Sequence, residues 1–211
     1  MNALILVDIQ NDFLPGGALP VPEGDQIIPV VNRIQPHFDL VVATQDWHPS
    51  DHGSFASNHA GSTPGQVIQL EGLDQVLWPA HCVQNTNGAA FAPGLDQQAW
   101  AKNFVKGTDP GIDSYSGFFD NGHRKATGLG DFLRDQGVTD VTIVGLATDY
   151  CVKFTALDAV ALGFRTTLVE DACRGVNLRP TDVADAVEAM RNAGIKIATV
   201  EDVLRSATPL A

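Results

Sequence analysis

The sequence has few cysteines, few basic residues and no long apolar run. Its three cysteines, Cys82, Cys151 and Cys173, cannot all pair within one chain, and there is no CxxC motif. A disulfide framework is therefore not expected. An odd number of cysteines leaves at least one free thiol, which could be reactive. The longest apolar runs have the length of strands and end at charge or glycine, so none resembles a transmembrane helix.

Basic residues are also outnumbered, with 13 Lys and Arg against 25 Asp and Glu, a formal charge of −12. Such a surface repels phosphate backbones, so we expect no nucleic-acid partner. The N-terminal stretch MNALILVDIQ has no basic leader and no cleavage site. We therefore expect no signal peptide, no membrane partner and a cytoplasmic location.

The chain has enough apolar residues for a sizeable core. Its 211 residues, 44% of them hydrophobic, predict one domain that covers residues 1–211. Most of its β-branched apolar runs lack alternation, as in parallel strands buried on both faces, and helical periodicity falls between several of them. This order predicts an α/β fold with a doubly wound parallel sheet of about six strands flanked by helices. The runs cover residues 3–9, 39–45, 103–107, 140–146, 165–171 and 195–200.

One segment, residues 46–101, does not follow this alternation. It is rich in Gly, Pro and Asn, and it holds four of the six histidines. A long irregular insertion in a compact domain is usually a functional loop or a disordered linker. Because the segment also carries Trp47 and Trp78, we predict an ordered functional insertion.

Polar residues follow four of the predicted strands. Asp8 ends the first run, Asp46 follows the second, Lys106 ends the third and Cys151 follows the fourth. In a parallel sheet these positions share one edge, where ligands bind at the point at which the strand order reverses. A strand order of 3-2-1-4-5 would place Asp8 beside Cys151.

Cys151 has two interpretations. A helix N-terminus stabilises a thiolate, and Thr148 or Asp149 would cap a helix with Cys151 in its first turn. The alternative is a buried structural cysteine, which is common. Asp8 and Lys106 could be an ordinary loop cap and a solvated strand end. Together with the thiol they instead suggest a catalytic group. In it the Asp8 carboxylate takes the proton of the thiol and passes it on, and the Lys106 amine holds the carboxylate and the thiolate in place.

The segment QDWHPSDH and the later WPAHCVQNT suggest a metal site. Asp46 and His48 are two residues apart, and His81 would complete a set of one carboxylate and two imidazoles. Such a set suits zinc, iron(II) or manganese. His52 and His59 are further candidates that the spacing does not exclude.

The motifs LVDIQNDF, QDWHP, WPAHCVQ, Lys106 and GLATDYCV occur in this order. Together they resemble the cysteine-hydrolase (isochorismatase-like) superfamily, and within it the nicotinamidases, over nearly the whole chain. The resemblance implies metal-dependent hydrolysis of nicotinamide to nicotinate and ammonia in NAD salvage, through a thioester. It also implies that pyrazinamide is accepted.

Further implications of the resemblance concern individual residues. It implies a catalytic triad and one divalent ion, with zinc expected and iron or manganese as alternatives. It also implies a substrate ring between aromatic side chains, an oxyanion hole of two backbone N–H groups, and a cis peptide between Leu146 and Ala147. The triad is Asp8, Lys106 and Cys151; the metal ligands are Asp46, His48 and His81; the aromatic residues are Phe13, Trp78 and Tyr115; the oxyanion-hole residues are Ala147 and Cys151.

Two departures from the family pattern stand out. Asn85 occupies a position that is often glycine, and the offset of His52 does not match the additional histidine of some relatives.

Three alternative functions remain. Isochorismatases lack the nucleophilic cysteine, and carbamoyl amidohydrolases need not carry the metal loop. A regulatory thiol or metal protein without turnover is the alternative from another class. Relatives commonly self-associate, so a homodimer is also expected.

Overall fold

Six parallel strands form the central sheet of the computed structural model, which describes residues 1–207. Their order across the sheet is β5-β2-β1-β6-β7-β8. In terms of the six predicted runs this is 3-2-1-4-5-6, so the doubly wound parallel sheet is confirmed. The strands are β1 (Asn2–Val7), β2 (Leu40–Asp46), β5 (Trp100–Lys106), β6 (Asp140–Leu146), β7 (Arg165–Arg174) and β8 (Lys196–Ala198).

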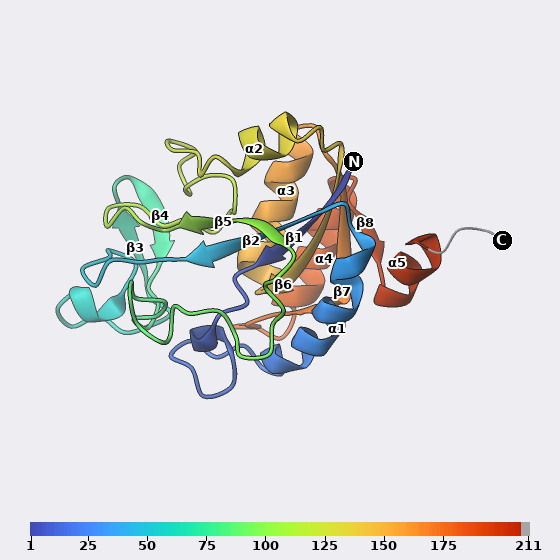
Figure 1. Ribbon diagram of the computed structural model, residues 1–211. Helices are drawn as coiled ribbons and strands as arrows, with labels where there is room; N and C mark the ends of the chain where they lie inside the picture. The colour runs from blue at the N-terminus through green and yellow to red at the C-terminus, as the bar shows by residue number, and fades with distance from the viewer. Residues whose placement is uncertain (208–211) are drawn as a thin grey trace.

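Helices cover both faces of this sheet (Figure 1). Successive side chains of β1 point to opposite faces of the sheet, so each face has its own apolar cluster. Ile5 packs into one cluster and Leu4 into the other. The first cluster is shared with α2 (Leu129–Asp135), α3 (Lys153–Ala161) and α4 (Asp182–Asn192). The second is shared with α1 (Ile27–Ile34) and α5 (Val200–Ala207). No helix within residues 1–207 is long and apolar enough to cross a membrane.

The insertion contains a hairpin that the sequence reasoning did not predict. Strands β3 (Val67–Leu70) and β4 (Leu73–Val76) pair antiparallel and form a separate two-stranded sheet. Glu71 and Gly72, with φ of 48° and 84°, form the two-residue turn between them. Both central residues have positive φ, as hairpin turns that match the strand twist require. The strands are short and partly polar, so their periodicity is weak.

Candidate active site

The four strand-end residues meet at one edge of the sheet. Lys106 ends β5, Asp46 ends β2, Asp8 follows β1, and Cys151 lies just beyond β6. Because β5, β2, β1 and β6 are neighbours in this order, their carboxyl ends bring the four side chains side by side. The predicted placement of Asp8 beside Cys151 is confirmed: carboxylate oxygens of Asp8 and Asp46 and the Cys151 sulfur all lie within 4.8 Å of one another.

Lys106 is the centre of the charge arrangement. Its Nζ lies 2.8 Å from Asp8 Oδ2 and 2.5 Å from Asp46 Oδ1, and it donates to the Ser114 carbonyl at 2.8 Å. Burial alone would lower the pKa of Lys106, but the carboxylates of Asp46 and Asp8 raise it well above its ordinary value. The amine therefore stays an ammonium ion, 3.5 Å from the Cys151 sulfur.

The thiol and its neighbouring carboxylate are both more basic than usual. Burial raises the pKa of Cys151 well above its ordinary value, although Lys106 opposes the shift. Burial also raises the pKa of Asp8, against the influence of Lys106 and of the Thr44 hydroxyl, which donates to Asp8 Oδ1 at 2.6 Å. A thiol that keeps its proton until a base removes it fits an adjacent carboxylate in the role of acceptor.

The turn that carries Cys151 differs from the predicted helix start. Residues Thr148–Val152 form one π-helical turn before α3, and Ala147 occupies the N-cap position without a side-chain cap. Neither Thr148 nor Asp149 caps the helix, so that expectation was wrong. Instead, the Asp149 carboxylate accepts backbone N–H groups of the segment that follows β7. The peptide between Leu146 and Ala147 is cis, as the resemblance implied.

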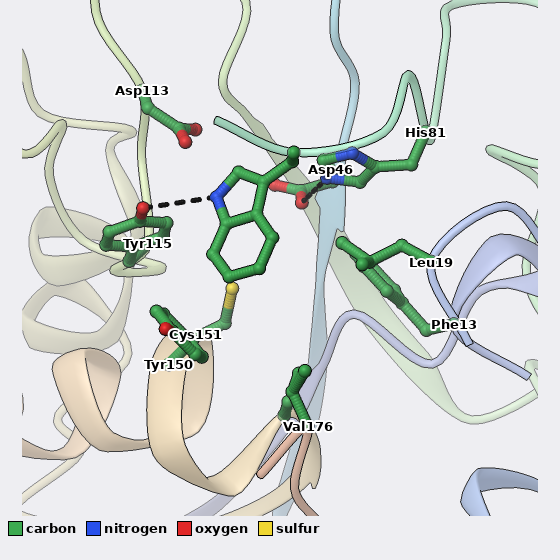
Figure 2. Close-up of a pocket in the computed structure, with 11 residues that line it drawn as sticks. Phe13, Leu19, Asp46, His81, Asp113, Tyr115, Tyr150, Cys151 and Val176 are labelled. Atoms are coloured by element: carbon green, nitrogen blue, oxygen red, sulfur yellow. Dashed lines mark hydrogen bonds and ion pairs between the residues drawn. The ribbon is translucent and has the colours of Figure 1, made fainter. Parts of the chain in front are cut away.

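A pocket opens above the Cys151 sulfur (Figure 2). Phe13, Trp78 and Tyr115, the three predicted aromatic residues, all line it, and Trp78 Nε1 donates to the Tyr115 hydroxyl at 3.2 Å. Ala147 also lines this pocket. Four further residues complete the wall and were not predicted: Leu19, Asp113, Tyr150 and Val176.

Asp46, His48 and His81 form the predicted metal cluster, with one ligand atom from each within 4.8 Å of the others. The His48 Nδ1 atom lies 2.8 Å from the Gly107 carbonyl, and His81 Nδ1 lies 2.8 Å from the Pro79 carbonyl. Each contact favours a proton on Nδ1 and leaves the Nε2 lone pair free, as in metal-binding histidines. The Nε2 atom of His48 is buried without a hydrogen-bond partner. These residues therefore fit a divalent ion.

The two other candidate histidines lie outside this cluster. His52 is buried beside His48, with ring centroids 4.4 Å apart, and forms a second candidate group with His48 and Asp113. The backbone N–H of Ser54 donates to His52 Nδ1 at 3.2 Å. His59 contacts the Gly53 carbonyl through Nε2 at 2.7 Å, and it is in none of the clusters found among the described residues.

Gln10 is a positioning residue that sequence reasoning missed. It is fully buried, and its side-chain amide pairs with the Asp46 backbone, accepting the N–H at 2.8 Å and donating to the carbonyl at 2.8 Å. A glutamine three residues beyond the end of a strand gives no strong sequence signal. Asn85, the unusual residue after the ligand loop, has φ of 63°. Asparagine tolerates this left-handed conformation, so the loop keeps the geometry that glycine would give.

Comparison with known proteins agrees with this geometry. The isochorismatase domain model matches residues 2–202. The chain is 53% identical to the nicotinamidase of Escherichia coli (strain K12), over 95% of this chain and 96% of that one. A solved nicotinamidase and pyrazinamidase of Acinetobacter baumanii superposes with a TM-score of 0.93 at 44% identity, covering 96% and 97% of the two chains. A pyrazinamidase of Pyrococcus horikoshii, solved in complex with zinc, gives 0.77 at 44%, covering 94% and 98%.

The fold and the site define a class of α/β enzyme that places a thiol, an ammonium group and a carboxylate where the strand order of a parallel sheet reverses. The chain belongs to the isochorismatase domain family. Its similarity to curated nicotinamidases over almost its whole length makes it an amidohydrolase within this family.

Proposed function

We propose that the protein hydrolyses nicotinamide to nicotinate and ammonia in NAD salvage, and that it also accepts pyrazinamide. The observation that carries the proposal is the position of Cys151 below a pocket with aromatic walls, with the Asp46 and His81 side chains at the same pocket. The relatives named nicotinamidase support it. An apolar slot suits a planar heteroaromatic ring, and polar groups at its end suit a ring nitrogen.

The proposed reaction begins at the thiol. Asp8 removes the proton of Cys151, and the sulfur attacks the carboxamide carbon. The same proton then passes to the leaving nitrogen, so that ammonia departs and a thioester remains. Asp8 next takes a proton from water, whose oxygen attacks the thioester carbon. The C–S bond then breaks, the sulfur regains the proton from Asp8, and nicotinate is released. Lys106, 2.8 Å from Asp8 and 3.5 Å from the sulfur, holds the carboxylate and stabilises the negative charge of the thiolate.

Two further groups support this chemistry in the proposal. The backbone N–H groups of Ala147 and Cys151 donate to the oxyanion. Asp46, His48 and His81 hold a divalent ion, with zinc expected, which supplies a Lewis acid for the pyridine nitrogen. We also propose that residues 1–211 act as one domain in the cytoplasm, with the insertion at 46–101 contributing to both the metal site and the pocket.

Ammonia release from nicotinamide tests the proposal. The wild-type protein loaded with zinc should release one ammonia for each nicotinate formed. Cleavage of a carbamoyl compound while nicotinamide stays intact would favour a carbamoyl amidohydrolase instead. A folded, zinc-loaded protein that turns over neither compound would contradict both of these functions and favour a regulatory protein without turnover.

A further inference from the structure

The pocket wall that contains Phe13, Leu19 and Val176 is built from loops. Figure 2 shows these three side chains on one side of Cys151, with Tyr115 on the other side. Phe13 ends a single 3-10 turn, whereas Leu19 and Val176 belong to no helix or strand. Loop segments of this kind need specific contacts to keep a fixed position, because they lack the hydrogen-bond ladder of a sheet.

The Asp12 carboxylate connects the first loop to the segment that carries His81. Its Oδ2 accepts the backbone N–H of Cys82, next to His81, at 2.7 Å. Its Oδ1 accepts the backbone N–H of Ala18, next to Leu19, at 3.2 Å. One carboxylate thus fixes two pocket segments that lie about seventy residues apart in the chain. The Phe13 and His81 rings of these two segments pack with centroids 5.5 Å apart.

The Asp149 carboxylate does the same on the other loop. Its Oδ1 accepts the backbone N–H of Val176 at 2.9 Å, and its Oδ2 accepts that of Asn177 at 2.8 Å. Asp149 is buried within the turn that carries Cys151. This carboxylate therefore ties the Val176 segment to the turn that presents the thiol. Hydrogen bonds to a charged acceptor are about twice as strong as neutral ones.

A glycine makes room for each carboxylate. A Cβ atom on Gly88 would overlap the carboxylate of Asp12. A Cβ atom on Gly175 would lie 3.0 Å from Asp149 Oδ1 and would overlap the Val183 side chain. The two carboxylates are thus fitted into their positions as well as hydrogen-bonded there.

We propose that Asp12 and Asp149 are positioning residues that hold the Phe13, Leu19 and Val176 wall against the substrate ring. They set the affinity for substrate and take no part in bond breaking. The inference rests on the proposed function, because it concerns how that pocket binds its ring. Neither carboxylate lines the pocket, so each acts through the loop that it holds.

The test compares KM with kcat for nicotinamide. Asp12→Ala and Asp149→Ala should each raise KM about tenfold or more and change kcat by no more than about threefold. Gly88→Ala keeps the Asp12 carboxylate but displaces it, so it should also raise KM with little change in kcat. Asp12→Asn and Asp149→Asn keep one acceptor oxygen and should give intermediate values. Asp135→Ala, at an exposed position of α2, is the matched control and should change neither constant.

Amide hydrogen exchange gives a second readout that needs no substrate. Asp12→Ala should speed exchange at Ala18 and Cys82, and Asp149→Ala at Val176 and Asn177, while the amides of β1 keep their protection. A fall in kcat at constant KM, or unchanged exchange at these amides, would overturn the inference and leave the proposed function intact. A wild-type protein that does not hydrolyse nicotinamide would instead refute the proposed function, and exchange alone would then decide whether the carboxylates hold the loops.

Discussion

At the scale of single residues, burial controls the acid–base chemistry of the pocket. The amine of Lys106 stays charged because two carboxylates surround it, whereas the Cys151 thiol keeps its proton because its burial outweighs the influence of that amine. The same rule applies to the two tyrosines of the chain, which both line the pocket. Burial raises the pKa of Tyr150 to about 12, and that of Tyr115 well above its ordinary value.

We therefore predict that neither phenol ionises in the folded protein up to pH 10.5. An ordinary tyrosine would be largely ionised there, because its pKa is about 10. Since the folded-state pKa values are raised, the unfolded chain loses these protons first, and the stability they contribute falls as pH rises above about 10. A spectrophotometric titration at 295 nm checks this: absorbance should stay flat and then rise together with unfolding. One phenolate per chain at pH 10.5 in folded protein would contradict the prediction.

The residues of the site differ in how far the sequence reveals them. Asp8, Asp46 and Cys151 were placed correctly because each lies at or just beyond the end of a continuously buried apolar strand, and parallel strands end at one edge. Lys106 ends the mostly exposed β5, and the order of the strands placed it at the same edge. Leu19, Asp113 and Val176 were missed because a loop side chain reaches a pocket through backbone turns and hydrogen bonds that have no periodicity. Tyr150 was missed because it belongs to the π-helical turn, which the sequence did not predict. The role of each predicted residue in catalysis stays a prediction until variants are measured.

At the scale of elements, a glycine stands where the ends of β1 and β6 pair. Val7 pairs with Gly145, whose φ is 126°, and a Cβ atom on Gly145 would overlap the Val7 carbonyl oxygen. This pair lies directly before Asp8 on one strand and two residues before Ala147 on the other. Glycine at this position allows the two strands to end close together and so brings the carboxylate near the thiol.

Gly145→Ala should therefore lower the free energy of unfolding by about 3 kcal/mol, since it combines steric overlap with a strained φ. Gly137→Ala is the matched control, because Gly137 also has positive φ (72°) but nothing lies within 4 Å of its added Cβ. That change should cost only about 1 kcal/mol. Urea unfolding of both variants gives the comparison, and equal losses would contradict the steric argument.

The elements themselves were predictable where burial is continuous. β1, β2 and β6 are almost wholly buried, and their apolar runs identify them without alternation. Strand β3 alternates exposed and partly buried residues over only four positions, and the four residues of β4 do not alternate, so neither gives a recognisable pattern. The π-helical turn before α3 was also missed, because its residues have the composition of an ordinary capped helix.

At the scale of the whole molecule, the proposed ion joins distant parts of the chain. Asp46 and His48 lie at the end of β2 and just beyond it, and His81 comes from the far part of the insertion. An ion that binds only the folded chain stabilises it, because the unfolded chain does not hold these ligands together. Its binding would therefore stabilise the insertion against the sheet.

We predict that zinc at about 100 times its dissociation constant adds about 2.7 kcal/mol of stability, or about 5–10 °C in Tm for a chain of this size. His81→Ala should abolish this increase. His37→Ala, which removes an exposed histidine outside the cluster, should keep it. Thermal unfolding of chelator-treated and zinc-loaded samples measures the effect. An equal zinc response in the His81→Ala protein would contradict the ligand assignment.

The central claim is that Cys151 attacks nicotinamide in this pocket. The most direct measurement is ammonia released from nicotinamide by zinc-loaded wild-type protein and by Cys151→Ala, with nicotinamide binding to the variant followed by calorimetry. The account predicts steady release by the wild type, no turnover by the variant, and retained binding to the variant, because the aromatic walls and the metal ligands are unchanged. Ammonia release by Cys151→Ala at the wild-type rate would show that the thiol is not the nucleophile.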